Sequence, residues 1–180
     1  MHDTDPEYRP PGATADRLVR ALLGLALLIV AALGVRQWVE GPVTRVDREL
    51  PTLSLSEVDS PTPLTLTEGR PTVLHVWLPG CGACAAEAPA YEAVRRRYEA
   101  AGVDFVALSV VPDAASTRRA ADRYGLRGTV ATSAGSVLDR IQVGSVPSTV
   151  WISGEGRVVA VAEGPQSERI LDRETARLLQ

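Results

Sequence analysis

The chain has 180 residues, of which 45% are hydrophobic and 23% charged, and its formal net charge is −3. This length fits one globular domain with additional sequence, and the absence of a basic excess argues against nucleic acid as a partner. The two cysteines are too few for a disulfide framework. A structural zinc site needs four ligands, and besides the cysteines the chain offers only His75 and His2, of which His2 lies in the N-terminal tail. We therefore expect neither a metal nor a cofactor.

An uncharged run, ALLGLALLIVAALGV, occupies residues 21–35. As a helix it would span about 22 Å, against a hydrocarbon core of about 30 Å. Extension to residues 18–39 closes this gap and predicts a transmembrane anchor, with Arg20 and Arg36 reaching the headgroups and Trp38 at the interface. A cleaved signal peptide is the alternative. We favour the anchor because the small-residue sequence Ala-Leu-Gly lies inside the run rather than after it.

The segments around this run divide the chain further. Residues 1–17 are polar and predict a disordered cytoplasmic tail. Residues 40–50 are expected to be a linker, and residues 51–180 a globular domain. The arginines on the two sides of the anchor balance, so they do not orient it. Because a long domain that follows a short polar tail is translocated largely regardless of its charge, we place the domain outside the cytoplasm.

The globular part alternates between strand-like and helix-like patterns. In chain order, the sequence predicts strands at 53–58, 64–66 and 72–77, a helix at 85–100, a strand at 103–110, a helix at 114–124, strands at 149–152 and 157–162 joined by a turn, and a helix at 167–179. Strands separated by helices pair in parallel, and the late hairpin adds antiparallel strands. The expected fold class is therefore α/β, a mixed central sheet flanked by helices.

The sequence WLPGCGAC lies where the strand at 72–77 ends and the helix at 85–100 begins. Cys81 would therefore lie at a helix N-terminus, where free N–H groups and the helix dipole favour a thiolate, the form that attacks disulfides. Cys84 follows one turn later on the same face and could resolve a mixed disulfide. A static structural disulfide is the alternative, but so small a ring constrains the unfolded chain little. The pair is predicted to be redox-active.

Three features together resemble a known family. The segment CGACAAEAP, which begins at Cys81, fits the pattern C-x-x-C-x-x-E-x-P. The sequence VPST around Pro147 resembles a cis-proline loop, and residues 53–66 resemble an extra N-terminal hairpin. On these grounds residues 50–179 resemble the thioredoxin-like superfamily, and within it the membrane-anchored TlpA/ResA-like thiol–disulfide oxidoreductases.

The resemblance implies a thioredoxin-like fold with an N-terminal β-hairpin extension and one transmembrane helix. It implies a single-pass protein of the bacterial cytoplasmic membrane with its catalytic domain on the periplasmic side. Pro147 would be cis, and the backbone of Val146 could pair with a substrate strand. The family usually has Trp before the first cysteine, where this chain has Gly80. This departure bears on the choice of partner more than on the thiol chemistry.

Two further residues have a structural and a functional interpretation. Glu87 lies early in the helix, where an acid complements the dipole; it could equally accept a proton and tune the pKa of the cysteines. His75 falls, by the resemblance, where thioredoxin has a buried acid beneath its dithiol. It could relay the proton of Cys84, or it could be a core histidine with no role.

The resemblance implies dithiol–disulfide exchange with protein partners, as a reductant re-reduced by a membrane electron donor, in cytochrome c or copper-site maturation. A disulfide oxidant or isomerase is the close alternative. A copper(I) chaperone is a second, because two thiolates suit that ion. Copper chaperones with this fold use a C-x-x-x-C motif together with a downstream histidine, and in this chain no histidine follows His75. Peroxide reduction needs Thr-x-x-Cys, but Leu78 stands three residues before Cys81.

Overall fold

A computed structural model of the chain describes residues 13–39, 41–60, 63–66, 69–133 and 137–180. Within the first range, side chains are described for residues 17–30. The chain forms two compact units, Met1–Val39 and Glu40–Gln180.

The first unit contains one helix, α1 (Ala13–Val39). It begins five residues before the predicted anchor at 18–39, inside the predicted tail at 1–17, because Ala13 and Ala15 are strong helix formers. The rest of that tail, residues 1–12, lies outside the described residues. Within the described part of the chain, no helix has the length and apolarity needed to cross a membrane.

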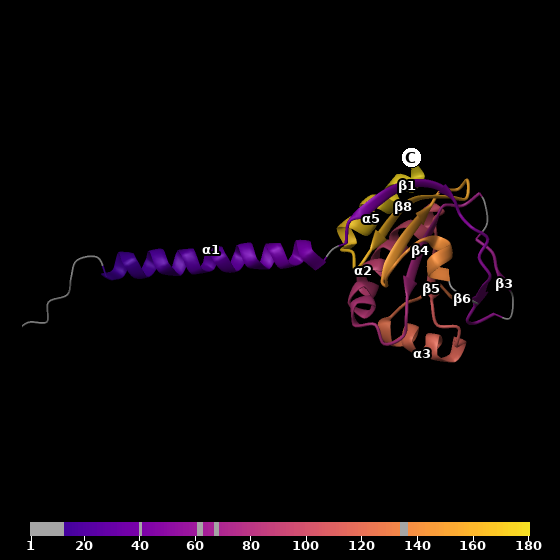
Figure 1. The fold of residues 1–180 in the computed structure, drawn as a ribbon, viewed down its shortest axis with the longest axis horizontal. Coiled ribbons are helices and arrows are strands. Elements are labelled where there is room, and N and C mark those ends of the chain that lie inside the picture. Colours follow the sequence, from indigo (N-terminus) through magenta and orange to yellow (C-terminus); the bar gives the residue numbers. More distant parts are fainter. Residues whose placement is uncertain (1–12, 40, 61–62, 67–68, 134–136) are drawn as a thin grey trace, which may run out of the picture. The chain divides into compact units, whose positions relative to one another are not determined.

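The second unit is built on one eight-stranded sheet with the order β1-β8-β7-β4-β5-β6-β2-β3. Its strands are β1 (Val43–Glu49), β2 (Leu55–Glu57), β3 (Pro63–Leu64), β4 (Thr72–Trp77), β5 (Asp104–Ser109), β6 (Thr129–Ser133), β7 (Ser148–Ile152) and β8 (Arg157–Glu163). β4, β5 and β6 are parallel neighbours, and the other pairs are antiparallel (Figure 1). The predicted mixed sheet is confirmed.

Helices cover the sheet in two layers. α2 (Gly82–Tyr98), α3 (Ala114–Tyr124) and α5 (Glu168–Ala176) bury apolar side chains in one core with one face of the strands. α4 (Val137–Ile141) and the region of β2 share a second core with the other face. Short 3-10 turns, Glu99–Ala101 and Arg177–Leu179, extend α2 and α5. β4 is buried along its whole length because it lies between both cores.

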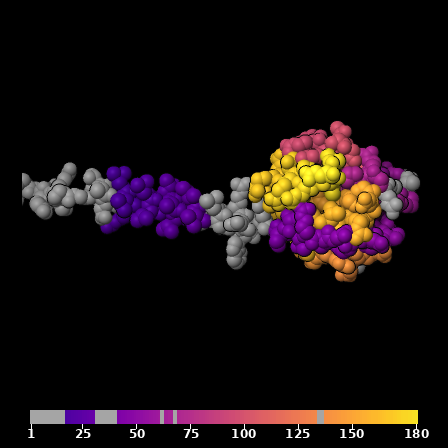
Figure 2. All heavy atoms as spheres, turned by 90° about the horizontal axis from the view of Figure 1, so that it is seen from above, coloured from indigo at the N-terminus to yellow at the C-terminus, as the bar shows by residue number. Residues whose placement is uncertain are grey.

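The prediction of a linker at residues 40–50 is wrong, because β1 forms there. β1 pairs antiparallel with β8 from Val43↔Ala162 to Glu49↔Arg157, with a register shift between Arg45 and Arg48. The strand was not predicted because its sequence is polar. As the last strand of the sheet, it exposes most of its side chains. Arg45 forms an ion pair with Glu174 of α5, and Figure 2 shows the violet β1 segment beside the yellow C-terminal helix.

Two elements, β6 and α4, were not predicted. The β6 sequence, TVATS, is short and half polar, and its burial comes from pairing with β5 on one side and β2 on the other. α4 has five residues, too few for a helical period to be recognised. Both lie between residues 125 and 147, which the sequence left without assigned structure.

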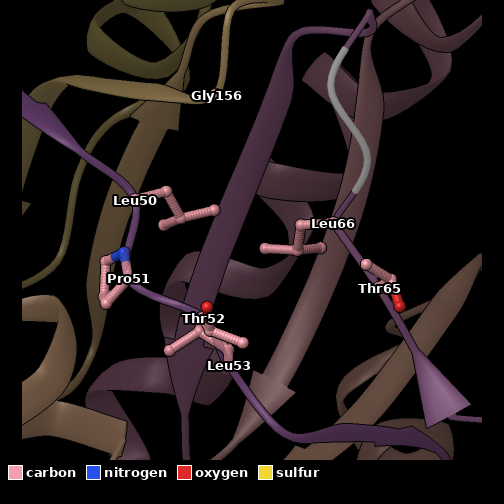
Figure 3. Close-up of a pocket in the computed structure, with 7 residues that line it drawn as sticks. All are labelled: Leu50, Pro51, Thr52, Leu53, Thr65, Leu66 and Gly156. Atoms are coloured by element: carbon pink, nitrogen blue, oxygen red, sulfur yellow. The ribbon is translucent and has the colours of Figure 1, made fainter.

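The predicted N-terminal hairpin is present as β2 and β3, which pair through Leu55↔Leu64. Between this hairpin and the turn after β7 lies a shallow pocket (Figure 3), lined by Leu50, Pro51, Thr52, Leu53, Thr65, Leu66 and Gly156. The β7–β8 turn adjoins the amino end of β4, because Ile152 pairs with Thr72. Cys81 follows the carboxyl end of β4, so Gly156 and the cysteine lie at opposite ends of that strand.

Candidate active site

Cys81 and Cys84 form a disulfide at the start of α2, with an S–S distance of 2.10 Å. Cys81 is the N-cap residue of the helix, and its Sγ accepts the backbone N–H of Cys84 at 3.0 Å. The helix thus begins three residues before the predicted start at residue 85. Cys81 is half-buried, whereas Cys84 has 0% exposure. A partner can therefore reach the first sulfur, and the second is shielded.

A proline loop leaves the same end of the sheet as the dithiol. β4 and β7 are antiparallel neighbours with Val76 opposite Ser148, so the residues before Ser148 and after Trp77 meet there. The Val146–Pro147 peptide bond is cis, in agreement with the prediction. Pro147 is buried and Val146 half-buried.

This proline loop is fixed by β8. The carboxylate of Glu163 accepts the N–H of Gly144 at 2.9 Å and the hydroxyl of Ser145 at 3.3 Å. The carbonyl of Pro147 accepts the N–H of Gly164 at 2.8 Å. Hydrogen bonds thus hold the proline loop at both of its ends.

A buried polar cluster lies between β4, β7 and α2. His75 has 0% exposure and Glu87 3%. Their Nδ1 and Oε1 atoms are 3.9 Å apart, beyond hydrogen-bond distance. The Thr149 hydroxyl donates to Oε1 of Glu87 at 3.4 Å, and the Tyr91 ring stacks on His75 with centroids 4.8 Å apart. The structure thus brings His75 and Glu87 together, and Glu87 lies three residues after Cys84 on α2.

Burial decides the charge of both groups. Desolvation raises the pKa of Glu87 to about 8, although hydrogen bonds from the Gln166 backbone and from Thr149 oppose the rise. Desolvation lowers the pKa of His75 to about 4. Near pH 7 the carboxyl group is therefore protonated and the imidazole neutral. The pair therefore carries no net charge, with an acidic proton on the carboxyl group and an unprotonated nitrogen on the imidazole.

Four residues of this site were not predicted. Tyr91 and Thr149 complete the buried cluster, Glu163 holds the proline loop, and the hydroxyl of Tyr124 accepts the N–H of Gly80 at 2.9 Å. The sequence spacing could have identified Tyr91, because it lies four residues after Glu87 and therefore on the same helix face. Over the residues that the structure describes, no group of three His, Cys, Asp or Glu side chains is placed to hold a metal ion.

Comparison with known proteins agrees with this geometry. Residues 45–178 match the family model described as Redoxin. The thiol-disulfide oxidoreductase ResA of Oceanobacillus iheyensis is 28% identical over 149 residues, which cover 79% of this chain and 78% of that protein. ResA of Halalkalibacterium halodurans is 28% identical over 106 residues, 58% of this chain and 60% of the relative. The chain thus spans less than two thirds of the length of this second relative.

Solved structures show the same fold. A secreted Mycobacterium tuberculosis disulfide oxidoreductase, homologous to E. coli DsbE, has a TM-score of 0.60 at 24% identity, covering 71% of this chain and 96% of that one. A thiol:disulfide interchange protein from Chlorobium tepidum has a TM-score of 0.65 at 19% identity, covering 76% of this chain and 99% of that one. The thioredoxin-like fold predicted from the sequence is confirmed. The chain belongs to the Redoxin family, among the thioredoxin-like thiol–disulfide oxidoreductases.

Proposed function

We propose that this protein reduces disulfides of partner proteins outside the cytoplasm through Cys81 and Cys84. The observation that carries the proposal is the unequal exposure of the two sulfurs, half-buried for Cys81 and 0% for Cys84. An accessible sulfur at a helix N-terminus suits attack on a partner. A shielded sulfur one turn later suits the intramolecular attack on the mixed disulfide, which releases the partner.

The reaction balances over two steps. The thiolate of Cys81 attacks one sulfur of the partner disulfide, forms a mixed disulfide and expels the other partner sulfur as a thiolate, which takes up a proton. Cys84 then loses its proton and attacks the sulfur of Cys81, which expels the second partner thiol. The partner gains two electrons and two protons, and the protein becomes the disulfide seen in the structure. A dithiol donor in the membrane would return the electrons.

The surroundings of the dithiol support the reducing direction. A strongly oxidising pair needs a stabilised reduced form. Apart from the cysteines, Glu87 is the one ionisable side chain between Leu78 and Ala90. This segment therefore holds no cation to stabilise the thiolate of Cys81, and burial keeps the carboxyl group of Glu87 neutral near pH 7. Within the segment, the helix dipole is the one stabilising electrostatic feature.

The buried cluster supports a proton relay during resolution. Cys84 must lose a proton before it attacks, and Glu87 already carries one near pH 7. In the proposed relay, one carboxyl oxygen of Glu87 accepts the Cys84 proton while the other passes its own to His75. The neutral imidazole of His75 is the free base of the pair, and a small shift closes the 3.9 Å between them.

The relay is tested by comparing the rate of the resolving step among variants. Single-turnover release of a partner thiol from the mixed disulfide would be followed in the wild type, H75N, E87Q and the double variant. Members of one relay should show equal slowing in the single and double variants, because either change interrupts the same path. Additive effects would contradict the relay.

Partner binding is proposed to use the proline loop. The backbone of Val146, next to the cis bond, could pair with a strand of the partner around its disulfide. The secreted M. tuberculosis oxidoreductase of similar fold is consistent with work outside the cytoplasm. The anchor at 18–39 stays a prediction from the sequence, to be tested by fractionating cells that express the full chain.

The direction of electron flow is tested by the potential of the Cys81–Cys84 pair. The full chain would be equilibrated in a graded thiol–disulfide buffer series, and free thiols trapped with an alkylating reagent. We expect a two-electron transition near the thioredoxin value of about −270 mV or below. A midpoint near the DsbA value of about −120 mV would make the protein an oxidant. Without any two-electron transition the enzyme proposal fails, and copper(I) binding would be tested instead.

A further inference from the structure

The turn that presents Cys81 is held by a side chain from a different part of the chain. Within the turn, the N–H of Cys81 donates to the carbonyl of Leu78 at 3.3 Å. Pro79 has no N–H to contribute. The N–H of Gly80 donates to the hydroxyl of Tyr124, at the end of α3, at 2.9 Å. One backbone bond and one side-chain bond therefore define this turn.

Tyr124 is itself held in place. It is the last residue of α3, which Gly125 ends in the left-handed conformation with φ 76°. Its ring contacts Trp77 edge to face, with centroids 5.6 Å apart and planes at 61°. Trp77 has 0% exposure. The hydroxyl of Tyr124 is thus carried on a ring that packs against the fixed core.

Gly80 contributes no packing of its own to the turn. Its φ is +88°, and a Cβ placed there would meet no atom within 4 Å. Glycine suits this left-handed backbone conformation, but it has no side chain that could pack against the rest of the domain. Gly80 is therefore held by the hydrogen bond from its N–H to the Tyr124 hydroxyl, which reaches across to α3.

We propose that Tyr124 is a positioning residue for Cys81, an inference that rests on the proposed thiol–disulfide exchange. By fixing Gly80 it fixes the residue that follows, which is the N-cap of α2. There the sulfur of Cys81 accepts the N–H of Cys84 at 3.0 Å and lies at the positive end of the helix dipole. Without the hydroxyl the turn moves more freely, and the thiolate of Cys81 loses part of this stabilisation.

The test compares Y124F with Y98F, a control of identical chemistry. Tyr98 ends α2, and its hydroxyl bonds to Asp172 rather than to the active-site turn. Each full-length protein would be reduced with dithiothreitol, freed of the reductant and alkylated with iodoacetamide across a pH series. Mass spectrometry would measure modification of Cys81. Y124F keeps the ring on Trp77, and circular dichroism would confirm that each variant is folded.

We expect Y124F to slow the alkylation of Cys81 at pH 7 at least threefold and to move the midpoint of its pH profile upward, whereas Y98F matches the wild type. A Y124F profile that superimposes on the wild type would overturn the inference. Alkylation needs no partner and no redox cycle, so the two proposals fail separately. If the wild type shows a two-electron transition and Y124F has no effect, the positioning role alone is wrong. If the transition is missing and Y124F still slows alkylation, the proposed function alone is wrong.

Discussion

Replacement of Glu87 by glutamine should change how the stability of the protein depends on pH. Burial raises the pKa of Glu87 from 4.5 to about 8. Between these values the unfolded chain has released this proton and the folded protein still holds it. The free energy of unfolding therefore falls as the pH rises through this window, by about 1.4 kcal/mol for each pH unit. Over the whole window the loss reaches at most about 5 kcal/mol.

The E87Q variant lacks this ionisation, so its stability relative to the wild type should increase steadily from pH 5 to pH 8. Urea denaturation of the oxidised full chain at several pH values would measure the difference. His75 is present in both proteins, so its own protonation largely cancels. The exposed Glu155 provides a control, since E155Q makes the same substitution at the surface, where no burial penalises the charged form. A difference between E87Q and the wild type that stays constant over this range would refute the buried, protonated state of Glu87.

Three further results are expected. G80A should lower the free energy of unfolding by about 1 to 2 kcal/mol in urea denaturation, because a residue with a Cβ is strained at φ +88° even where space is open. A neutral effect would contradict the observed backbone conformation. E163A should raise KM for a protein disulfide severalfold, because the hydrogen bonds from Gly144 and Ser145 that hold the proline loop are lost. The reduction potential of the Cys81–Cys84 pair should stay unchanged, and a shifted potential would place Glu163 in the redox chemistry instead. R45A should cost no more than about 1 kcal/mol, because its guanidinium is half exposed; a much larger loss would show that β1 depends on this ion pair.

The elements that carry the dithiol were predictable because their signals are local. An apolar strand, a Cys-x-x-Cys pair and an alanine-rich helix follow one another within about thirty residues, so the placement of Cys81 at a helix start needed no tertiary information. The cis bond at Pro147 was predictable through the family resemblance, since the local sequence alone gives a low prior for a cis proline.

The remaining parts depend on contacts between segments distant in sequence. The sequence of β1 has the polar composition of a linker, and only its pairing with β8 makes it a strand. β6 is buried because it pairs with strands on both sides. The partners of His75 and Glu87 come from two different elements, with Tyr91 on α2 and Thr149 on β7. Neither periodicity nor spacing states which polar side chains a fold brings together in its core, so the composition of the cluster was not predictable.

The charged border strand has a consequence for aggregation. A protein proposed to bind partner chains through the backbone of Val146 risks the same pairing wherever a strand edge is open. β1 forms that edge beside β8, and it carries Arg45, Asp47, Arg48 and Glu49 together with an irregular register. Charges and bulges are the features by which sheets discourage the addition of another chain. The β1 border thus discourages edge-to-edge assembly, while the proline loop, just before the start of β7 and separated from β1 by β8, is left for a substrate strand.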